Sequence, residues 1–170
     1  MLIYCMRHGI AEERDHERWP DDGERPLTEE GAKKTRRAAR GLKALGLSPD
    51  LVLTSPLARA RATAAIVAAT LNLPEEAVQE TDALIPEAAE TGIIGRISTE
   101  SNDAEIFLVG HEPMLSHLVS RLLTGNRNAV SIEMRKSALL CLETRELPVS
   151  GRATLSFFLK PSMLRTLGES

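Results

Sequence analysis

The sequence predicts an α/β fold in which a mostly parallel sheet lies between two layers of helices. Apolar runs of strand length alternate along the chain with stretches whose apolar residues recur at helical spacing, and this order is typical of parallel sheets with helical crossovers. Residues 2–6 and 105–109 are short and mostly apolar, as buried strands are. A chain of 170 residues is long enough for one domain with its own core. We therefore expect a single domain over residues 1–170.

The first third of the chain contains a strand, a long loop and a helix. The strand at residues 2–6 stops at Arg7-His8-Gly9, and residues 10–26 are dense in charge and turn formers. Long loops in small domains often have a function, and we expect this one to arch over the end of the strand with Trp19 as an anchor. Thr28 is the predicted N-cap of a helix that ends at Gly46.

The rest of the chain repeats the pattern of strand and helix. Ser55 is predicted to be an N-cap with Pro56 at the first helical position, opening a helix to about residue 71. Two late strands are expected to be joined by a turn that contains Pro148 and Gly151. The predicted strands are 51–54, 77–80, 105–109, 138–144 and 153–159, and the predicted helices are 88–100 and 113–123.

Composition excludes several classes of protein. The net charge is −3 and no run of five basic residues occurs, which argues against a nucleic-acid surface. Cys5 and Cys141 lie in apolar runs, so we expect buried, reduced thiols, and neither begins the Cys-x5-Arg loop of a thiol phosphatase. No stretch has the length and apolarity of a membrane span, and a strand that starts at Met1 leaves no room for a signal peptide. We expect a cytoplasmic protein without a membrane partner.

Polar side chains follow three of the predicted strands. These are Arg7-His8 after the first strand, Ser55 with Arg59 one turn later, and His111 after residues 105–109. The carboxyl ends of parallel strands meet at one edge of a sheet, where ligands bind. Arginine binds phosphate oxygens bidentately and keeps its charge, and helix N-termini favour anions. The pattern predicts a phosphate site in which an imidazole is nucleophile, acid, base or donor.

Other known motifs for binding phosphate or metal ions do not occur in the sequence. Gly41 and Gly46 have the spacing of a Walker A motif, but Leu47-Ser48 follows where Lys-Ser/Thr is required. There is no Gly-x-Gly-x-x-Gly, and the histidines do not cluster with carboxylates at metal-ligand spacing. We expect neither a metal nor another cofactor.

Four ordered motifs resemble the histidine phosphatase superfamily, which has the phosphoglycerate-mutase-like fold. The short chain and its Arg-Pro-Leu-Thr segment are most similar to the small SixA-type phosphohistidine phosphatases. The resemblance runs from Met1 to about Leu123 and continues more weakly through Lys136-Ser137-Ala138 and the final strand. The motifs are Met6-Arg7-His8-Gly9, Arg25-Pro26-Leu27-Thr28 with Gly31, Ser55-Pro56-x-x-Arg59-Ala60-x-x-Thr63, and Val109-Gly110-His111 with Pro113.

The resemblance implies roles for these residues. His8 would be the nucleophile that carries the phosphoryl group between two half-reactions, and Arg7, Arg59 and His111 would form the phosphate pocket. Gly9, Arg25 and Ser55 are assigned to substrate binding, Arg25 as a residue that approaches the substrate. The partner would be a phosphorylated protein or a small phosphorylated substrate.

The proton donor of the mutase-like members is not matched. These proteins carry a glutamate two residues after a leucine, but here Pro86 stands at that distance from Leu84 and Glu87 is one residue late. Either Glu87 has moved into the role, or no carboxylic acid serves it. A phosphohistidine nitrogen leaves more readily than an alkoxide, so a site without an acid would favour phosphorus–nitrogen bonds.

Three functions follow from these residues. The first is a phosphatase that uses His8 on phosphohistidine in a protein, and the second is a phosphatase of the same fold for small phosphate esters. The third is a non-catalytic module that binds phosphorylated ligands. Binding requires cations but no nucleophile, so the presence of His8 favours the two enzymes.

Overall fold

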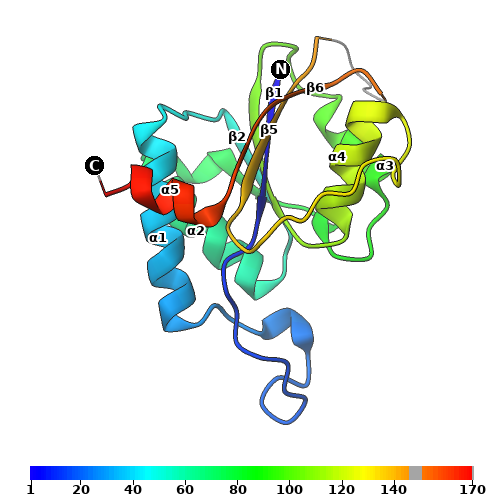
Figure 1. Cartoon of the computed structure of the whole chain (residues 1–170). Helices are drawn as coiled ribbons and strands as arrows, with labels where there is room; N and C mark the ends of the chain where they lie inside the picture. The colour runs from blue at the N-terminus through cyan, green and yellow to red at the C-terminus, as the bar shows by residue number, and fades with distance from the viewer. Residues whose placement is uncertain (146–150, 170) are drawn as a thin grey trace.

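A six-stranded mixed sheet forms the middle layer of the molecule, as Figure 1 shows. The computed structural model describes residues 1–145 and 151–169. The strand order is β3-β2-β4-β1-β5-β6, with parallel pairing from β3 to β1 and antiparallel pairing of β5 with β1 and β6. The mostly parallel sheet is therefore confirmed. The strands are β1 (Leu2–Arg7), β2 (Leu51–Thr54), β3 (Val78–Glu80), β4 (Glu105–Gly110), β5 (Leu139–Glu143) and β6 (Thr154–Leu159).

Helices cover both faces of the sheet, which confirms the three-layer architecture. In Figure 1 α1, α2 and α5 lie on one side of the strands, and α3 and α4 lie on the other. Side chains alternate between the faces of a strand, so the neighbours Phe107 and Leu108 of β4 belong to two separate hydrophobic clusters. The helices are α1 (Glu29–Ala44), α2 (Ala58–Leu71), α3 (Glu90–Ile97), α4 (Met114–Thr124) and α5 (Pro161–Leu167).

The register of the central strands brings their carboxyl ends together. β1 and β4 run parallel with Arg7 beside Gly110. The backbone continues this alignment past the strands, because the amide of His8 donates to the carbonyl of Gly110 at 3.1 Å and the amide of Ser55 donates to that of Val109 at 3.0 Å. The residues that follow β1, β2 and β4 therefore start from one edge of the sheet, as predicted.

The start of α2 differs from the prediction. The helix begins at Ala58, and its N-cap is Leu57, which provides no side-chain cap. Ser55 lies before the helix, where its hydroxyl oxygen is 3.0 Å from Nε2 of His111. The N-cap prediction for Ser55 is therefore wrong, because tertiary contact with a histidine on another strand end replaces local capping.

Two other helices differ in extent from the prediction, and a third helix was not predicted. The helix expected over residues 88–100 is shorter, since α3 spans Glu90–Ile97, and Pro113 is the N-cap of α4 rather than its first residue. The short α5 was not predicted. It depends on packing against α1, where a Cβ at Gly41 would lie 2.0 Å from the carbonyl oxygen of Leu164. Seven residues are too few for helical periodicity to predict such a helix from sequence.

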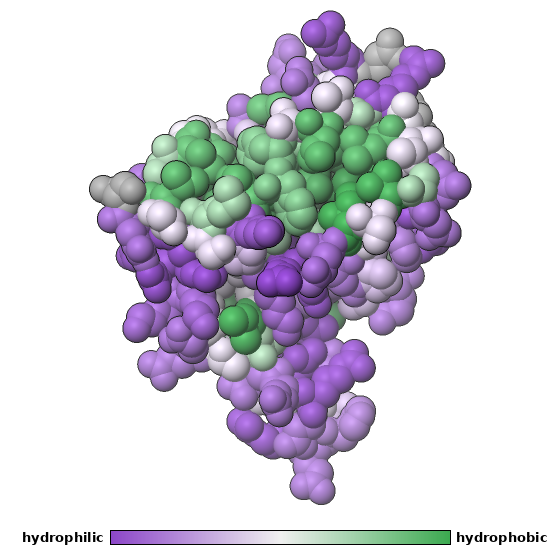
Figure 2. All heavy atoms as spheres, in the orientation of Figure 1, coloured by the Kyte–Doolittle hydropathy of each residue, from purple (hydrophilic) through white to green (hydrophobic). Residues whose placement is uncertain are grey.

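The loop over residues 10–26 projects from the lower end of the molecule in Figure 1 and is hydrophilic in Figure 2. It contains a short 3-10 helix, η1 (Asp22–Glu24), and is closed by a bridge between Ala11 and Leu27. Trp19 is half-buried, with the guanidinium of Arg18 stacked 5.5 Å from its ring centroid. Thr28 is the N-cap of α1, as predicted, and accepts from the amide of Gly31 at 2.9 Å.

Two further predictions concern the end of the sheet and the cysteines. Pro148 of the predicted turn lies outside the described residues, and Gly151 has a φ of +74°, a conformation that glycine adopts at little cost. Cys5 and Cys141 are buried and free, and burial raises the pKa of Cys141 to about 11.

Among the described residues, no helix combines the length and apolarity needed to cross a membrane.

Candidate active site

A cavity of about 220 Å³ opens where the strands end. Five of the seven predicted site residues line it, and Gly9 and Ser55 do not. Most of the residues that line it carry a charged or an imidazole side chain. The lining residues are Arg7, His8, Arg14, Arg25, Arg59, Pro86, His111, Glu112 and Lys136.

The ring of His8 is fixed in one tautomer. Its Nδ1 lies 2.7 Å from the carbonyl oxygen of Gly9. A carbonyl oxygen only accepts, so Nδ1 carries the proton and Nε2 keeps its lone pair. Burial lowers the pKa of His8 to about 2, and the cationic form is disfavoured further by His111 and the nearby arginines. His8 is therefore a neutral imidazole with a free nucleophilic nitrogen.

His111 is held as the partner of His8. The two ring centroids are 4.8 Å apart. Ser55 accepts from the amide of Leu57, and among the described residues Nε2 of His111 is the acceptor for its hydroxyl proton, at 3.0 Å. A hydrogen bond in this direction leaves the proton of His111 on Nδ1, where it can be donated to an oxygen anion. Burial lowers the pKa of His111 to about 3, with Arg59 the next cause.

These two pKa values predict that neither imidazole becomes charged in the neutral range. Because both are lowered from the usual value of about 6.5, the rings gain a proton only near pH 3 or below. In a heteronuclear NMR titration between pH 5 and pH 8, we expect the ring signals of His8 and His111 to stay constant. Spectra of His8→Ala and His111→Ala assign the signals, and a midpoint near pH 6.5 for either ring would contradict the prediction.

Two arginines carry buried donors that the described residues leave unpaired. Nη1 of Arg7 donates to the carbonyl of Met134 at 2.9 Å, and Nη1 of Arg59 donates to that of Asp22 at 2.7 Å. The Nε groups of Arg7 and Arg59 are buried and have no partner in the described part of the chain. An unpaired buried donor costs about 1–3 kcal/mol. Two such donors on cations that line one cavity suit the oxygens of an anion.

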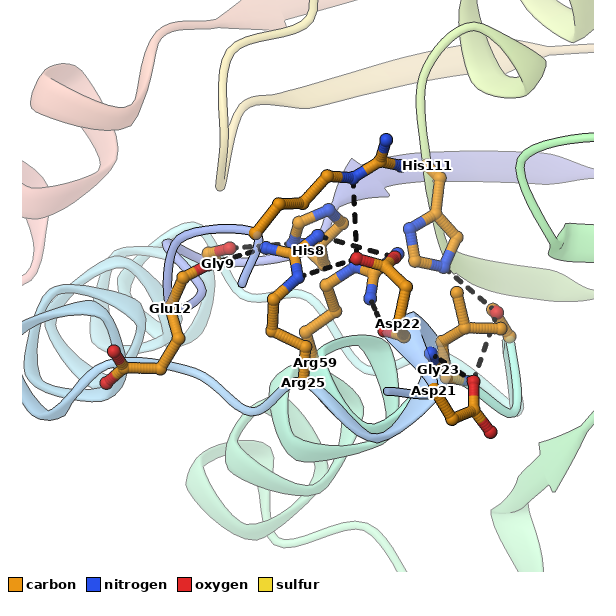
Figure 3. Close-up of polar contacts among 12 residues, drawn as sticks. His8, Gly9, Glu12, Asp21, Asp22, Gly23, Arg25, Arg59 and His111 are labelled. Carbon is orange, nitrogen blue, oxygen red and sulfur yellow. Dashed lines mark hydrogen bonds and ion pairs between the residues drawn. The ribbon is translucent and has the colours of Figure 1, made fainter. Parts of the chain in front are cut away.

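Asp22 contacts two arginines of the candidate site, a position that the sequence did not reveal. Its carboxylate lies between Arg25 and Arg59 in Figure 3 and accepts from Nε of Arg25 at 2.9 Å and from Nη2 of Arg59 at 3.1 Å. Asp22 thereby orients both guanidinium groups and joins the loop to the site. The charge density of residues 10–26 hid it, because nothing in the sequence distinguishes it from Asp15 or Asp21.

Lys136 and Arg14 add two cations that the prediction also missed. Lys136 reaches the cavity because Ser137, with a φ of +64°, folds the chain back so that its amide donates to the carbonyl of Arg7 at 3.0 Å. Burial and the neighbouring arginines lower the pKa of Lys136. The weak family resemblance through Lys136-Ser137-Ala138 was the available signal, and it assigned Lys136 no role in the site.

Gly9 does not line the cavity, and its role is to allow a close approach of the backbone to neighbouring side chains. A Cβ at this position would lie 2.4 Å from Oγ1 of Thr35, and the Gly9 amide donates to Oγ1 of Thr63 at 3.0 Å. Gly9 therefore lets the chain pass close to α1 and places the carbonyl that fixes the tautomer of His8. Ser55 likewise contacts His111 and is fully buried, so the structure brings both residues to the histidines instead of to the cavity.

The carboxylate at the cavity is Glu112. Glu87 is exposed and does not line the cavity, whereas Pro86 and Glu112 do. The first alternative for the proton donor, Glu87, therefore has no geometric support. The second alternative, that no carboxylic acid serves as the proton donor, stays a prediction, because a place on the cavity wall does not by itself make Glu112 a proton donor.

Two neighbouring side chains lie outside the site. His117 accepts from Nη2 of Arg127 at 2.7 Å and lies 3.8 Å from the buried Glu90, so it belongs to a structural cluster, as expected. Arg61 is exposed and lies 3.9 Å from Glu80. In the part of the chain that the structure describes, no three His, Cys, Asp or Glu side chains are grouped as metal ligands would be.

Comparisons with known proteins show which family and which fold this chain resembles. The model of the histidine phosphatase superfamily (branch 1) matches residues 3–85. An uncharacterised protein of Picosynechococcus sp. is 32% identical over 164 residues, which cover 95% of this chain and 96% of that protein. Phosphohistidine phosphatase SixA of Escherichia coli is 29% identical over 171 residues, which cover 97% of each chain. A solved structure of the protein histidine phosphatase SixA with tungstate has a TM-score of 0.83 at 27% identity, and the match covers 95% of this chain and 98% of that chain.

Proposed function

Because this chain belongs to the histidine phosphatase superfamily, we propose that it removes phosphate from phosphohistidine in a protein, through a phosphoryl intermediate on His8. The observation that carries the proposal is the site itself. The neutral His8, with Nε2 unprotonated, lines the same small cavity as Arg7 and Arg59, whose buried Nε donors have no partner among residues 1–145 and 151–169.

The reaction divides into two displacements at phosphorus. In the first, the lone pair of His8 Nε2 attacks, a P–N bond to His8 forms, and the bond to the leaving group breaks with its electron pair going to the leaving nitrogen, which takes up a proton. In the second, water attacks phosphorus, the bond to His8 breaks and its electron pair returns to Nε2. Arg7, Arg59 and the Nδ1 proton of His111 offset the charge on the phosphoryl oxygens.

A substrate whose bulk lies outside the cavity suits the dimensions of the site. A volume of about 220 Å³ accommodates a phosphoryl group, and of the lining residues only Pro86 offers an apolar surface. Pockets for small organic ligands are larger, about 300–1,000 Å³, and mostly apolar. A phosphorylated side chain presented by a protein places only the phosphoryl group and its ring in such a cavity. The similarity to SixA over nearly the whole chain supports the same substrate class.

A substrate panel tests the proposal. We expect kcat/KM for a phosphohistidine protein to exceed that for phosphoserine, phosphotyrosine and sugar phosphates by a factor on the order of 10² or more, because a phosphohistidine ring that is protonated leaves as a neutral imidazole, whereas the esters lose an alkoxide or a phenoxide. Release of free phosphate is the measurement. A preference for sugar phosphates would identify a small-ester phosphatase, and binding of phosphate without turnover of any substrate would identify a binding module.

Activity is expected to need no metal ion. The charge on a phosphoryl group in the cavity would be offset by hydrogen-bond donors of the chain itself, namely Arg7, Arg59, His111 and Lys136. In other phosphatases a divalent cation has this role. Incubation with EDTA and removal of the chelator should leave kcat/KM within about twofold of its starting value. Loss of turnover that is restored by a divalent ion would contradict this expectation.

A further inference from the structure

Glu112 directly follows His111 and is the one carboxylate on the cavity wall among the described residues. It stands at the end of β4, immediately before Pro113 and α4. The other wall residues are cations, histidines and a proline, so among the lining residues Glu112 alone brings a carboxyl group to the wall.

The contacts of Ser116 accommodate a protonated Glu112. Oγ of Ser116 lies 2.5 Å from Oε2 of Glu112 and 2.9 Å from the carbonyl oxygen of Pro113. A serine hydroxyl has one proton to donate, and a carbonyl oxygen cannot donate at all. The Ser116 hydroxyl therefore either shares its proton between these two oxygens, or accepts a hydrogen bond from a neutral Glu112 and donates to Pro113.

Burial favours the neutral form of the Glu112 carboxyl group. Burial raises the pKa of the carboxyl group, against the opposing effects of the Ser116 hydrogen bond and the charges of Arg7 and His117. Its Oε1 is buried without a partner in the described part of the chain. A buried carboxylate with an unpaired oxygen is costly, whereas the neutral acid is not penalised in the same way.

We propose that Glu112 is the acid–base residue of the reaction, an inference that rests on the proposed function of the same site. In the first displacement the carboxylic acid gives its proton to the leaving atom as the bond to phosphorus breaks. In the second the resulting carboxylate takes a proton from the attacking water as the bond from His8 to phosphorus breaks. Each turnover returns Glu112 to the acid form, so the protons balance without a further reactant.

Leaving groups of different basicity separate this role from a structural one. Phenol, with a pKa of about 10 like tyrosine, leaves with difficulty unless it is protonated, whereas the much more acidic 2,4-dinitrophenol leaves as its anion. In Glu112→Gln we expect kcat/KM for phenyl phosphate to fall by about 10²-fold or more and that for 2,4-dinitrophenyl phosphate to fall by less than about threefold. Glu87→Gln, an exposed carboxyl group beside the cavity-lining Pro86, is the matched control and should change neither rate.

The wild-type protein gives a second readout that does not depend on how the variant folds. With an internal acid, kcat/KM across substituted phenyl phosphates should vary only weakly with the basicity of the leaving group. A steep dependence in the wild type, an equal loss on both esters in Glu112→Gln, or no loss on either would overturn the role of Glu112. Turnover of the esters without turnover of a phosphohistidine protein would overturn the proposed substrate and leave Glu112 standing. A wild-type protein inert toward both esters and phosphoramidate would overturn the phosphatase reaction and, with it, this role.

Discussion

Replacement of His8 by alanine is expected to abolish the covalent intermediate and to lower kcat/KM by at least about 10⁴-fold, on the scale seen when other enzymes lose their nucleophile. The reason is geometric. Gly9 fixes the proton on Nδ1, and burial keeps the ring neutral, so His8 presents an unprotonated Nε2 on the cavity wall. The remaining cations can bind the phosphoryl group but cannot form the bond to it.

The measurement is retention of labelled phosphate after a rapid quench that avoids acid, because acid hydrolyses phosphohistidine. Wild-type protein should retain label on His8 and the alanine variant should retain none. His16→Ala is the matched control, since His16 is an exposed histidine of the neighbouring loop and should leave labelling unchanged. Thermal unfolding of both variants tests whether the fold is intact. Label on His8→Ala protein would refute the assignment of the nucleophile.

The parts of the site that stand at strand ends could be predicted from the sequence. An apolar run that stops at Arg7-His8 or at His111 specifies a buried strand and the residue just beyond it. The parallel pairing of β1 with β4 then brings the two histidines to centroids 4.8 Å apart. Local pattern and global fold agree at these positions, and for that reason the sequence alone predicts that the two histidines lie together.

The residues that loops deliver could not be predicted in the same way. Asp22 reaches Arg59 from 37 positions away, and Lys136 depends on the positive φ of Ser137. Neither distance nor backbone conformation is encoded in a periodic pattern. The mistaken N-cap at Ser55 has a related cause, since a serine before a helix and a serine that orients a histidine look alike in sequence. Glu112 directly follows His111, but no sequence pattern marks a carboxyl group there as an acid, and the family resemblance points to the region of Glu87 instead.

The second large effect is expected at Arg59. Side chains two positions apart on an α-helix point in directions that differ by about 200°, so Arg59 and Arg61 cannot both face the cavity. Arg59 is almost fully buried and lines it, whereas Arg61 is exposed. Hydrogen bonds to charged groups are worth about 1.5–3 kcal/mol, and loss of the Arg59 guanidinium should lower kcat/KM by at least about tenfold.

Three variants separate charge, geometry and helix phase. Arg59→Ala should show the full loss, and Arg59→Lys should recover only part of it, because an ammonium group keeps the charge but lacks the planar fork that reaches both Asp22 and a phosphoryl oxygen. Arg61→Ala should stay within about twofold of wild type, since an exposed pair such as Arg61–Glu80 contributes at most about 1 kcal/mol to stability and nothing to the cavity. Comparable losses in Arg59→Ala and Arg61→Ala would mean that the wrong face of α2 has been assigned to the phosphoryl group.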